Sequence, residues 1–554
     1  MAYVDVLPVR PPNAVAPASI DGSYGRLYDR LAIICLVGVF IAAVLTFGDF
    51  AISTDEQVQH TYGRLLLDYY LSGLTDTRVF EYSNLYLYGG LFDLIAAIVS
   101  VFSPLPDYET RHLICAIIGL CGIFAAWRLG RLAGGPRVGL LTVVLLTVCP
   151  AYYGAMFNNT KDVPFAAGMT WLLYLSCRLL PELPRPSLRI VVGLGTAAGL
   201  SLGIRVGALL GGFYLIPVLA LHCLDSARRV GRRQAMIGAG VMLVRLLPAV
   251  VVALALMAVL WPWSVMAPGN IFTAVHDLTQ FDIPTVLAGH LYSSHDIPPW
   301  YIPAYFLVKL PESVLVGLLA SVIASVVCIS RTDHFLSTIR YRQWLIITLA
   351  ATLPVLYAVV TEPALYNGLR HFLFVVTPMC VLAAAGLDRM FTLIRRWRTV
   401  FGLALTLFAS AVVKDVWTMV ALHPHEYVYY NLLVGGVSGA NGRYETDYWS
   451  NFTREAIDRL TDRLAAENGG SLPDRTYDVD LCTSSWPLTA YAPPQLRTAD
   501  DCQDADFFIS TTNTNCDRIC NGRTIIEIKR LGVVLGVVKD RRSIAGMAER
   551  GAQH

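Results

Sequence analysis

The sequence predicts a polytopic α-helical membrane protein with a small α/β domain at its C-terminal end. Of its 554 residues, 55% are hydrophobic and only 15% are charged, whereas soluble globular proteins carry about 25% charged residues. Many apolar runs approach the roughly 20 residues that a helix needs to cross a bilayer. The residues after about 422 return to the composition of a soluble domain. These three observations together give the fold class.

Eleven apolar runs are expected to cross the membrane. The first is too long for a removable signal peptide and lacks a small-residue cleavage site. Residues 1–28 are expected to form a cytoplasmic leader, residues 29–422 the membrane domain and residues 423–554 the C-terminal domain. The runs lie at about 30–50, 111–130, 137–154, 163–180, 189–204, 207–223, 243–262, 304–329, 343–360, 371–387 and 400–421.

The basic residues of the membrane half predict its orientation. Short loops rich in Lys and Arg mark the cytoplasmic side of a membrane protein. The basic loops fall on alternate sides of the runs and share the side of the N-terminus, which we expect to be cytoplasmic. The C-terminal domain is then extracytoplasmic, periplasmic if the membrane is a bacterial inner membrane. The net charge of +2 gives no indication of nucleic-acid binding. The loops are 128–137, 181–189, 225–234, 331–342 and 388–399.

The interval 55–105 carries amphipathic and moderately apolar segments that do not read as spans. If residues 86–103 crossed the membrane, the basic loops would no longer alternate correctly. Their aromatic content suits helices that lie at the membrane surface. We therefore expect interfacial helices in a large first external loop.

The C-terminal domain has patterns of both helix and strand. Residues 451–468 have helical spacing with an Asn or Thr cap. Four strands are expected at 476–482, 504–511, 524–532 and 533–540.

Four of the 12 cysteines cluster in this domain, whereas the other eight are scattered singly through the apolar runs. An even number on an oxidising side of the membrane predicts two disulfides. Four cysteines allow three pairings, and Cys482–Cys502 with Cys516–Cys520 is favoured. A zinc site is the alternative, although a Cys-x3-Cys spacing is poor for zinc.

An acidic pair begins the first external loop, in the stretch "ISTDEQVQH". Asp55 and Glu56 are adjacent, and His60 lies one helical turn beyond Glu56. Acids at the N-terminus of a helix also complement the helix dipole, which is the structural alternative. The functional interpretation is that Asp55 is a catalytic base and that Glu56 orients a neighbouring group or the substrate.

Cations gather at the outer ends of two other runs. The turn "NNTKDVP" holds Asn159, Lys161 and Asp162, and it is more polar than a hairpin turn requires. Arg370 and His371 lie at the outer end of the tenth run, where arginine is unusual and costly near lipid. An anionic partner would offset that cost, and phosphate suits arginine. Arg370, His371 and Lys161 are therefore candidates for binding a phosphate.

Two aromatic stretches on the same side suit a carbohydrate. Ring faces pack against sugar C–H groups and carboxylates accept from hydroxyls, although simple aromatic packing or an interfacial belt is the alternative. Together with Asn159, Asp162 and His60, the candidates for sugar or acceptor binding are His295, Trp300, Tyr301, Asp447 and Trp449.

This inventory matches the transfer of a sugar from a lipid phosphate. The phosphate leaves readily once its charge is neutralised, so one carboxylate base is enough for a single displacement with inversion. No cofactor or metal is indicated. A flippase or transporter of a lipid-linked substrate is the alternative, but it would be expected to show paired halves or broken helices at the bilayer midplane. A receptor or scaffold would not need these charged residues.

At these residues the chain resembles the GT-C superfamily of polyprenyl-phosphate-sugar-dependent glycosyltransferases. It is similar to family 39 and to the bacterial branch related to dolichyl-phosphate-mannose–protein mannosyltransferases. The lipid A aminoarabinose transferases share this architecture, but no motif singles out aminoarabinose. The residues that carry the resemblance are "TDE" (54–56), "NNTKDVPFA" (158–166), "PPWYIPAYFLVKLP" (298–311), "LYNGLRHFLFVVTP" (365–378), "HPHEYVYYNLLVGG" (423–436) and "GRYETDYW" (442–449).

The resemblance implies an inner-membrane enzyme that moves a sugar to a hydroxyl of a lipid, glycan or protein. It implies Asp55 as the base, and basic residues at outer span ends as the ligands of the lipid phosphate.

Overall fold

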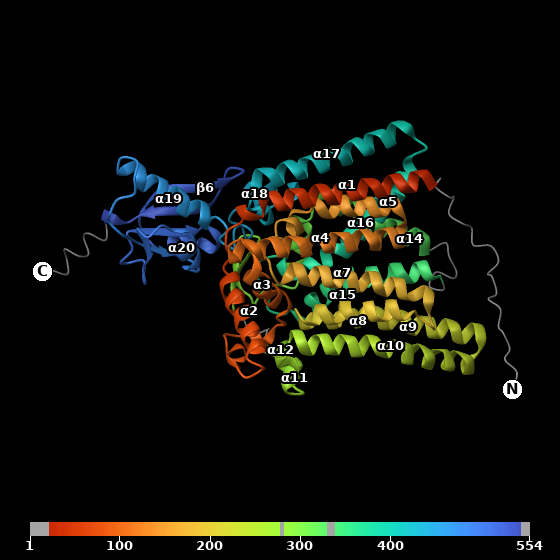
Figure 1. The fold of residues 1–554 in the computed structure, drawn as a ribbon. Helices are drawn as coiled ribbons and strands as arrows, with labels where there is room; N and C mark the ends of the chain where they lie inside the picture. The colour runs from red at the N-terminus through yellow and green to blue at the C-terminus, as the bar shows by residue number, and fades with distance from the viewer. Residues whose placement is uncertain (1–21, 278–281, 330–337, 544–554) are drawn as a thin grey trace.

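The structure is a computed structural model that describes residues 22–277, 282–329 and 338–543. Long helices lie side by side in one bundle, and a smaller domain that contains a β-sheet lies at one end of it (Figure 1). Many large apolar side chains of the bundle are exposed on its outer surface, as a lipid-facing surface requires. The fold class predicted from the composition is confirmed.

Eight helices of the described residues are long and apolar enough to cross a membrane, and the bent pair α13 and α14 raises the number to nine. The eight are α1 (Gly22–Thr46), α4 (Asp107–Gly134), α7 (Asp162–Leu179), α9 (Leu210–Val230), α10 (Arg232–Leu260), α15 (Ile339–Thr361), α16 (Leu373–Ile394) and α17 (Arg398–Leu422). The bent pair consists of α13 (Tyr301–Lys309) and α14 (Glu312–Ile329).

Two of the 11 expected spans form shorter helices. The run 137–154 is divided between α5 (Pro136–Thr147) and α6 (Pro150–Tyr153), because a proline cannot continue a helix. The run 189–204 forms α8 (Leu188–Leu202), whose 15 residues extend only about 22 Å at the helical rise of about 1.5 Å per residue. A bilayer core is about 30 Å thick. The expected number of spans was therefore too high by this measure.

A sharp bend of 116° separates α13 from α14. Pro311 lies in the two-residue link between them, and proline disrupts the helical hydrogen bonding there. The bend leaves Lys309 at the end of α13, where its Nζ donates to the carbonyl of Tyr427 at 2.8 Å. Residues that follow the last membrane helix therefore pack against the middle of the chain.

The first external loop is helical, as expected. It contains the short helices η1 (Phe47–Asp49), α2 (Glu56–Leu71), η2 (Arg78–Phe80), η3 (Leu85–Leu87) and α3 (Leu91–Phe102). α2 and α3 lie at the end of the bundle that faces the C-terminal domain (Figure 1). They pack closely, because Gly63 leaves room for the carbonyl of Asp93, which a Cβ would strike.

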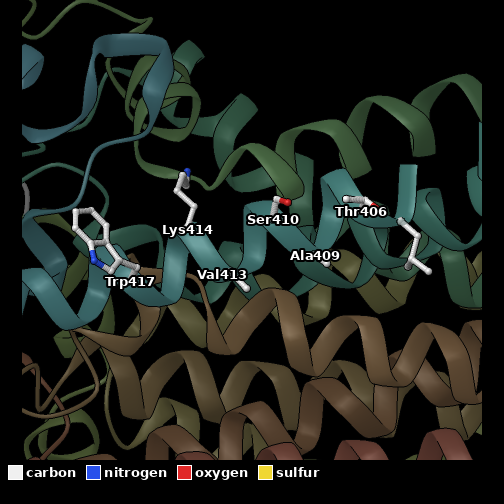
Figure 2. Close-up of a pocket in the computed structure, with 7 residues that line it drawn as sticks. Thr406, Ala409, Ser410, Val413, Lys414 and Trp417 are labelled. Atoms are coloured by element: carbon white, nitrogen blue, oxygen red, sulfur yellow. The ribbon is translucent and has the colours of Figure 1, made fainter. Parts of the chain in front are cut away.

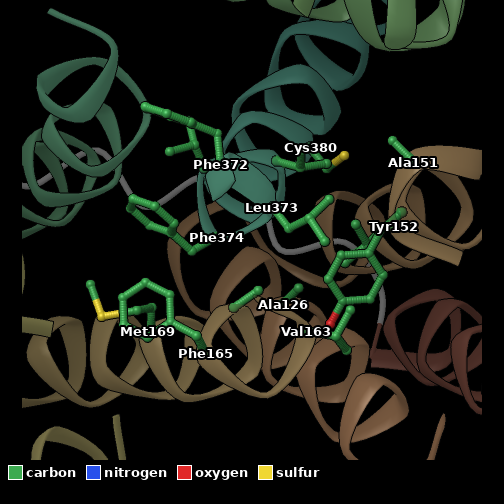
Figure 3. Close-up of a cluster of buried hydrophobic side chains, with 14 of the residues drawn as sticks. Ala126, Ala151, Tyr152, Val163, Phe165, Met169, Phe372, Leu373, Phe374 and Cys380 are labelled. Atoms are coloured by element: carbon green, nitrogen blue, oxygen red, sulfur yellow. The ribbon is translucent and has the colours of Figure 1, made fainter. Parts of the chain in front are cut away.

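The core of the bundle is packed between α4, α7 and α16 (Figure 3). Phe165 of α7 meets Phe374 of α16 edge-on, with ring centroids 5.2 Å apart. Farther along the same helices, the hydroxyls of Thr170 and Thr377 lie 2.7 Å apart. Because α7 and α16 begin at the same end of the bundle, the residues just before each helix lie near one another.

The rest of the external side consists of short elements. They are η5 (Val206–Leu209), α11 (Trp263–Met266), α12 (Asn270–Asp277), the antiparallel pair β1 (Pro284–Leu287) and β2 (His290–Ser293), η7 (Arg370–Phe372), η8 (Glu426–Val428), η9 (Leu432–Val434) and α18 (Gly436–Ala440). On the opposite side, η4 (Leu180–Glu182) follows α7.

The C-terminal domain is a five-stranded mixed sheet in the order β4-β3-β5-β7-β6. All four expected strands are present, together with the short β4 and the helix α20, which were not expected. α19 packs on the sheet and closes a separate apolar core. The elements are α19 (Thr453–Glu467), β3 (Tyr477–Leu481), α20 (Trp486–Tyr491), β4 (Leu496–Thr498), β5 (Phe507–Thr511), η10 (Asn513–Arg518), β6 (Arg523–Arg530) and β7 (Val533–Asp540).

The side-chain cap expected for α19 is absent, and the residues next to the helix bind the first external loop. Phe452 occupies the cap position without a side-chain hydrogen bond. The Oδ1 atom of Asn451 instead accepts from the backbone N–H of Ala51 at 2.6 Å. The N–H of Ile52 donates to the hydroxyl of Tyr491 at 3.0 Å. The domain thus braces the residues that lead to Asp55.

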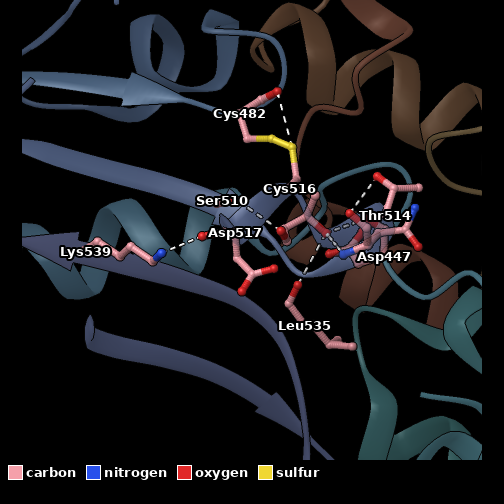
Figure 4. The surroundings of a disulfide bond; sticks show 10 residues. Asp447, Cys482, Ser510, Thr514, Cys516, Asp517, Leu535 and Lys539 are labelled. Carbon is pink, nitrogen blue, oxygen red and sulfur yellow. Dashed lines mark hydrogen bonds between the residues drawn. A yellow bond between two sulfur atoms is a disulfide. The ribbon is translucent and has the colours of Figure 1, made fainter. Parts of the chain in front are cut away.

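Two disulfides form in the C-terminal domain, but the favoured pairing is wrong. One bond joins Cys482 with Cys516 (Figure 4), and the other joins Cys502 with Cys520. The Cα atoms are 6.2 and 6.3 Å apart, within the usual range. β3 and β5 are parallel neighbours, so the end of β3 lies beside η10, which follows β5. The expected pairing joined cysteines that are close in sequence, whereas the parallel pairing of β3 and β5 brings Cys482 beside Cys516.

Candidate active site

Asp55 forms an ion pair with Arg370 at the end of the bundle nearest the C-terminal domain. The Nη1 atom of Arg370 donates to Oδ2 of Asp55 at 2.8 Å. Asp55 lies at the cap position of α2, but its side chain makes no capping hydrogen bond. The Asp55 side chain is 41% exposed and that of Arg370 is 10% exposed. The carboxylate therefore meets both solvent and a cation.

The segment that carries Arg370 is held by a tight turn. Asn367 and Gly368 have φ values of 55° and 65°, which glycine and asparagine tolerate best. The N–H of Gly368 donates to the hydroxyl of the buried Tyr301 at 3.0 Å. Arg370 then stacks over the ring of Tyr366, with its Cζ 5.1 Å from the centroid. Tyr301 therefore positions this segment, and its hydroxyl is already used.

A second cationic group surrounds the ring of Tyr88. The Nζ of Lys161 lies 3.9 Å from the ring centroid and the Cζ of Arg205 lies 5.5 Å from it. Arg205 pairs with Asp162 at 2.6 Å. Asn159 donates to the other carboxylate oxygen of Asp162 at 3.0 Å. Lys161 and Arg205 therefore both lie against one aromatic ring.

The two groups lie close enough to influence each other electrostatically. Burial lowers the pKa of Lys161 to about 8, and the charges of Asp55 and Asp162 act against this shift. Burial raises the pKa of Tyr88, which the charges of Arg205 and Arg370 oppose. Asp93 also acts on Lys161, but it is paired with Arg111 at 2.7 Å. Positive charge is therefore in excess over the carboxylates here, which suits an anion.

A small pocket lies behind Arg370. Its walls combine two cations, three aromatic rings and an amide. The lining residues are Ala151, Ala155, Lys309, Asn367, Leu369, Arg370, Leu373, Tyr427, Tyr448 and Trp449.

A larger groove of about 640 Å³ follows the outward face of α17 (Figure 2). Lys414 lies at one end of it, and that lysine is paired with both Glu312 and Asp415. Two carboxylates therefore neutralise the one cation of the groove, and we do not place the phosphate there.

One segment of the chain matches a known protein family. Residues 94–263 match the family model of dolichyl-phosphate-mannose-protein mannosyltransferases. No curated protein sequence matches the chain significantly.

Among solved structures, ArnT from Cupriavidus metallidurans in the apo state is 16% identical, with a TM-score of 0.47 over 95% of this chain and 99% of that chain. ArnT bound to undecaprenyl phosphate is 15% identical, with a TM-score of 0.44 over 94% and 98%. The oligosaccharyltransferase AglB from Archaeoglobus fulgidus, in complex with an inhibitory peptide and a dolichol-phosphate, is 11% identical, with a TM-score of 0.47 over 89% and 70%.

The matched segment contains the cationic residues near Tyr88 but not Tyr88 itself. Lys161, Asp162 and Arg205 fall within the matched residues, whereas Asp55 and Arg370 lie outside them. The candidate site is therefore assembled from the matched segment and from parts of the chain on both sides of it.

Glu56 is placed differently from its neighbour Asp55. It is fully buried, accepts from the N–H of Ser53 at 2.7 Å and pairs with the buried His112 at 3.0 Å. This carboxylate folds back on the loop that leads into α2. It stabilises the local backbone and does not reach the exposed side of the site.

Several other candidates also have structural partners. His60 accepts from Nε of Arg64 at 3.0 Å, and burial lowers its pKa to about 4. Asp447 is buried and accepts from the N–H groups of Asn451 and Phe452, both at 3.0 Å. Its oxygens are thus occupied by the start of α19. Trp449 is buried as well, but it lines the pocket behind Arg370.

The remaining candidates lie apart from the ion pair. His295 and Trp300 are exposed, and among the described residues neither forms a contact with Asp55, Lys161 or Arg370. His371 adjoins the site, because Nε of Arg370 donates to its Nε2 at 3.4 Å.

Arg205 is the main residue that the sequence interpretation missed. It lies in "SLGIRVGAL", between two apolar helices at the end of the bundle that has few basic residues. The argument that singled out Arg370, an arginine on the side where positive charge is unusual, applies equally to Arg205. Tyr88 and Lys309 gave no comparable signal.

Proposed function

We propose that this protein is an integral-membrane inverting glycosyltransferase. It moves a sugar from a polyprenyl-phosphate donor to a hydroxyl of a lipid, glycan or protein acceptor on the extracytoplasmic face. The contact between the half-exposed Asp55 and Arg370, beside Lys161 and Arg205, is the observation that supports it most.

The cations bind the phosphate of the donor. Arg370, Lys161 and Arg205 together offset the charge that develops on the leaving phosphate, and His371 lies beside Arg370. Charge-assisted hydrogen bonds of this kind contribute about 1.5–3 kcal/mol each. The leaving group then needs no general acid.

Asp55 is the base. It accepts the proton of the acceptor hydroxyl as the oxygen attacks the anomeric carbon from the face opposite the phosphate, which inverts the configuration. Glu56 and Tyr301 act as positioning residues, since one holds the loop of Asp55 and the other holds the turn before Arg370.

Replacing Asp55 with asparagine tests this role. Asp55→Asn keeps the size of the side chain but cannot take up a proton, so turnover should fall by about 100- to 10,000-fold. The assay measures sugar transfer by purified protein from a polyprenyl-phosphate donor. Asp76→Asn is the matched control, because within the described ranges Asp76 forms an ion pair only with the exposed Arg78. An Asp55→Asn protein that folds and transfers sugar at the parent rate would exclude Asp55 as the base.

A further inference from the structure

Arg370 has two functions to serve with one guanidinium. In the proposed reaction it binds the donor phosphate, yet in this structure its Nη1 is bonded to the base, Asp55, at 2.8 Å. Among the described residues, Asp55 is the only carboxylate in an ion pair with Arg370. The two partners of Arg370, carboxylate and phosphate, are both anions and therefore compete for it.

We propose that Arg370 withholds Asp55 from the acceptor until the donor phosphate arrives and replaces the carboxylate. This inference rests on the proposed function. Without donor, Arg370 holds the Asp55 carboxylate through its Oδ2 atom. The carboxylate is then not free to turn toward the acceptor hydroxyl. With donor, the phosphate takes over the guanidinium and Asp55 turns to the acceptor.

The packing of the two side chains determines which of them moves. Arg370 lies on the ring of Tyr366 and is 10% exposed, whereas Asp55 is 41% exposed and makes no capping bond. The aspartate is thus free to rotate away while the arginine stays in place. Glu56 could not exchange in this way, because it is fully buried against His112.

The surrounding charges favour the phosphate in this exchange. Lys161 and Arg205 both lie against the ring of Tyr88, and the charges of Arg205 and Arg370 both act on that tyrosine. Arg205 already has a carboxylate partner, Asp162, whereas the positive charge of Lys161 is balanced by no ion pair among the described residues. A phosphate can contact both Arg370 and this lysine.

Once Asp55 is released, the sugar is transferred in a single displacement. The acceptor O–H bond breaks and its proton moves to Asp55, while the acceptor oxygen forms a bond to the anomeric carbon. The bond between that carbon and the phosphate oxygen breaks, and its electron pair leaves with the polyprenyl phosphate. Asp55, whose side chain is 41% exposed, then releases this proton to solvent. The restored Asp55–Arg370 contact helps to displace the polyprenyl phosphate.

Binding of undecaprenyl phosphate to the purified full-length protein tests the exchange. Asp55→Asn should tighten binding on the order of tenfold, because Arg370 no longer has a charge-assisted partner to lose. In an Arg370→Ala background, Asp55→Asn should change the affinity less than about twofold, since there is no guanidinium to release. Asp162→Asn is the charge-matched control, because it removes a nearby carboxylate that pairs with Arg205.

The results separate the exchange from simple repulsion. If Asp55→Asn tightens binding equally with and without Arg370, or no more than Asp162→Asn does, general electrostatics is responsible and the exchange is wrong. An unchanged or weaker affinity in Asp55→Asn also overturns it, although the proposed function survives if Arg370→Ala weakens binding. If the parent protein does not bind undecaprenyl phosphate or dolichyl phosphate at all, the proposed donor class and the exchange both fail.

Discussion

The ion pairs around the candidate site differ sharply in burial. The side chains of the Glu56–His112 and Asp93–Arg111 pairs are at most 2% exposed, whereas Asp55 is 41% exposed. Removing one partner of a buried pair costs about 3–5 kcal/mol, while an exposed pair contributes about 1 kcal/mol or less. The buried pairs therefore fix the loops in place. The Asp55–Arg370 pair can open on the side of its half-exposed aspartate when another anion replaces the carboxylate beside Arg370, which is 10% exposed.

Lys161 should give donor binding a pH dependence. Burial lowers its pKa to about 8, so the lysine carries its charge below that pH and loses it above. A sugar phosphodiester does not titrate in this range. The KM for the donor should therefore rise as the pH increases through about 8, by roughly tenfold if one charge-assisted contact is lost.

Arginine keeps its charge throughout this range, so Lys161→Arg should abolish the rise in KM. Lys161→Met should show a high KM at every pH and no step near 8. A parent profile that coincides with that of Lys161→Arg would show that another group titrates.

At the scale of the elements, the site depends on segments that are held from outside the bundle. Thr285, at the start of the β1–β2 hairpin, donates to the buried Glu445 at 2.5 Å and lies 2.8 Å from the hydroxyl of Tyr301. Tyr301 in turn holds Gly368. The hairpin, α13 and residue 445 therefore fix the turn that presents Arg370, and they connect the membrane bundle with the segment that follows α17.

Two disulfides cross-link the C-terminal domain. Peptide mapping under non-reducing conditions should recover Cys482 linked to Cys516 and Cys502 linked to Cys520. Replacing one bonded pair with serine should destabilise the domain by about 2–5 kcal/mol, measured by thermal unfolding. Cys121→Ser is the control, because this exposed cysteine of α4 is free. Recovery of Cys516 linked to Cys520 would contradict the pairing.

At the scale of the whole molecule, the two ends of the bundle carry different charge. The basic turn between α9 and α10 lies at the end of the bundle away from the C-terminal domain, whereas α2 lies at the other end (Figure 1). Asp55 directly precedes α2 and pairs with Arg370. The ion pairs that join the basic loops are Arg131–Asp29, Arg137–Asp388 and Arg342–Asp225. This separation is what a membrane protein with one cytoplasmic face requires.

The orientation of the bundle can be tested directly. By the positive-inside trend, the end with the basic loops should face the cytoplasm and residue 500 should lie on the opposite side. Labelling of single cysteines in intact cells with a membrane-impermeant reagent should therefore reach position 500 but not position 228. Labelling of position 228 alone would reverse the orientation and exclude an extracytoplasmic reaction.

The sequence by itself determined the features that depend on local pattern. Apolar length predicted the helical membrane body, alternation predicted four strands of the C-terminal domain, and charge asymmetry singled out Arg370. These signals can be read because burial in lipid or in a sheet imposes a period on neighbouring residues.

Only the tertiary structure decided which distant residues meet. The contacts between Asp55 and Arg370, and between Lys161, Tyr88 and Arg205, join residues far apart in sequence. The different environments of Asp55 and Glu56, adjacent acids of the same type, also depend on it. The disulfide pairing follows from a parallel strand crossover. Such contacts are set by how helices and strands pack, which no local pattern of residues records.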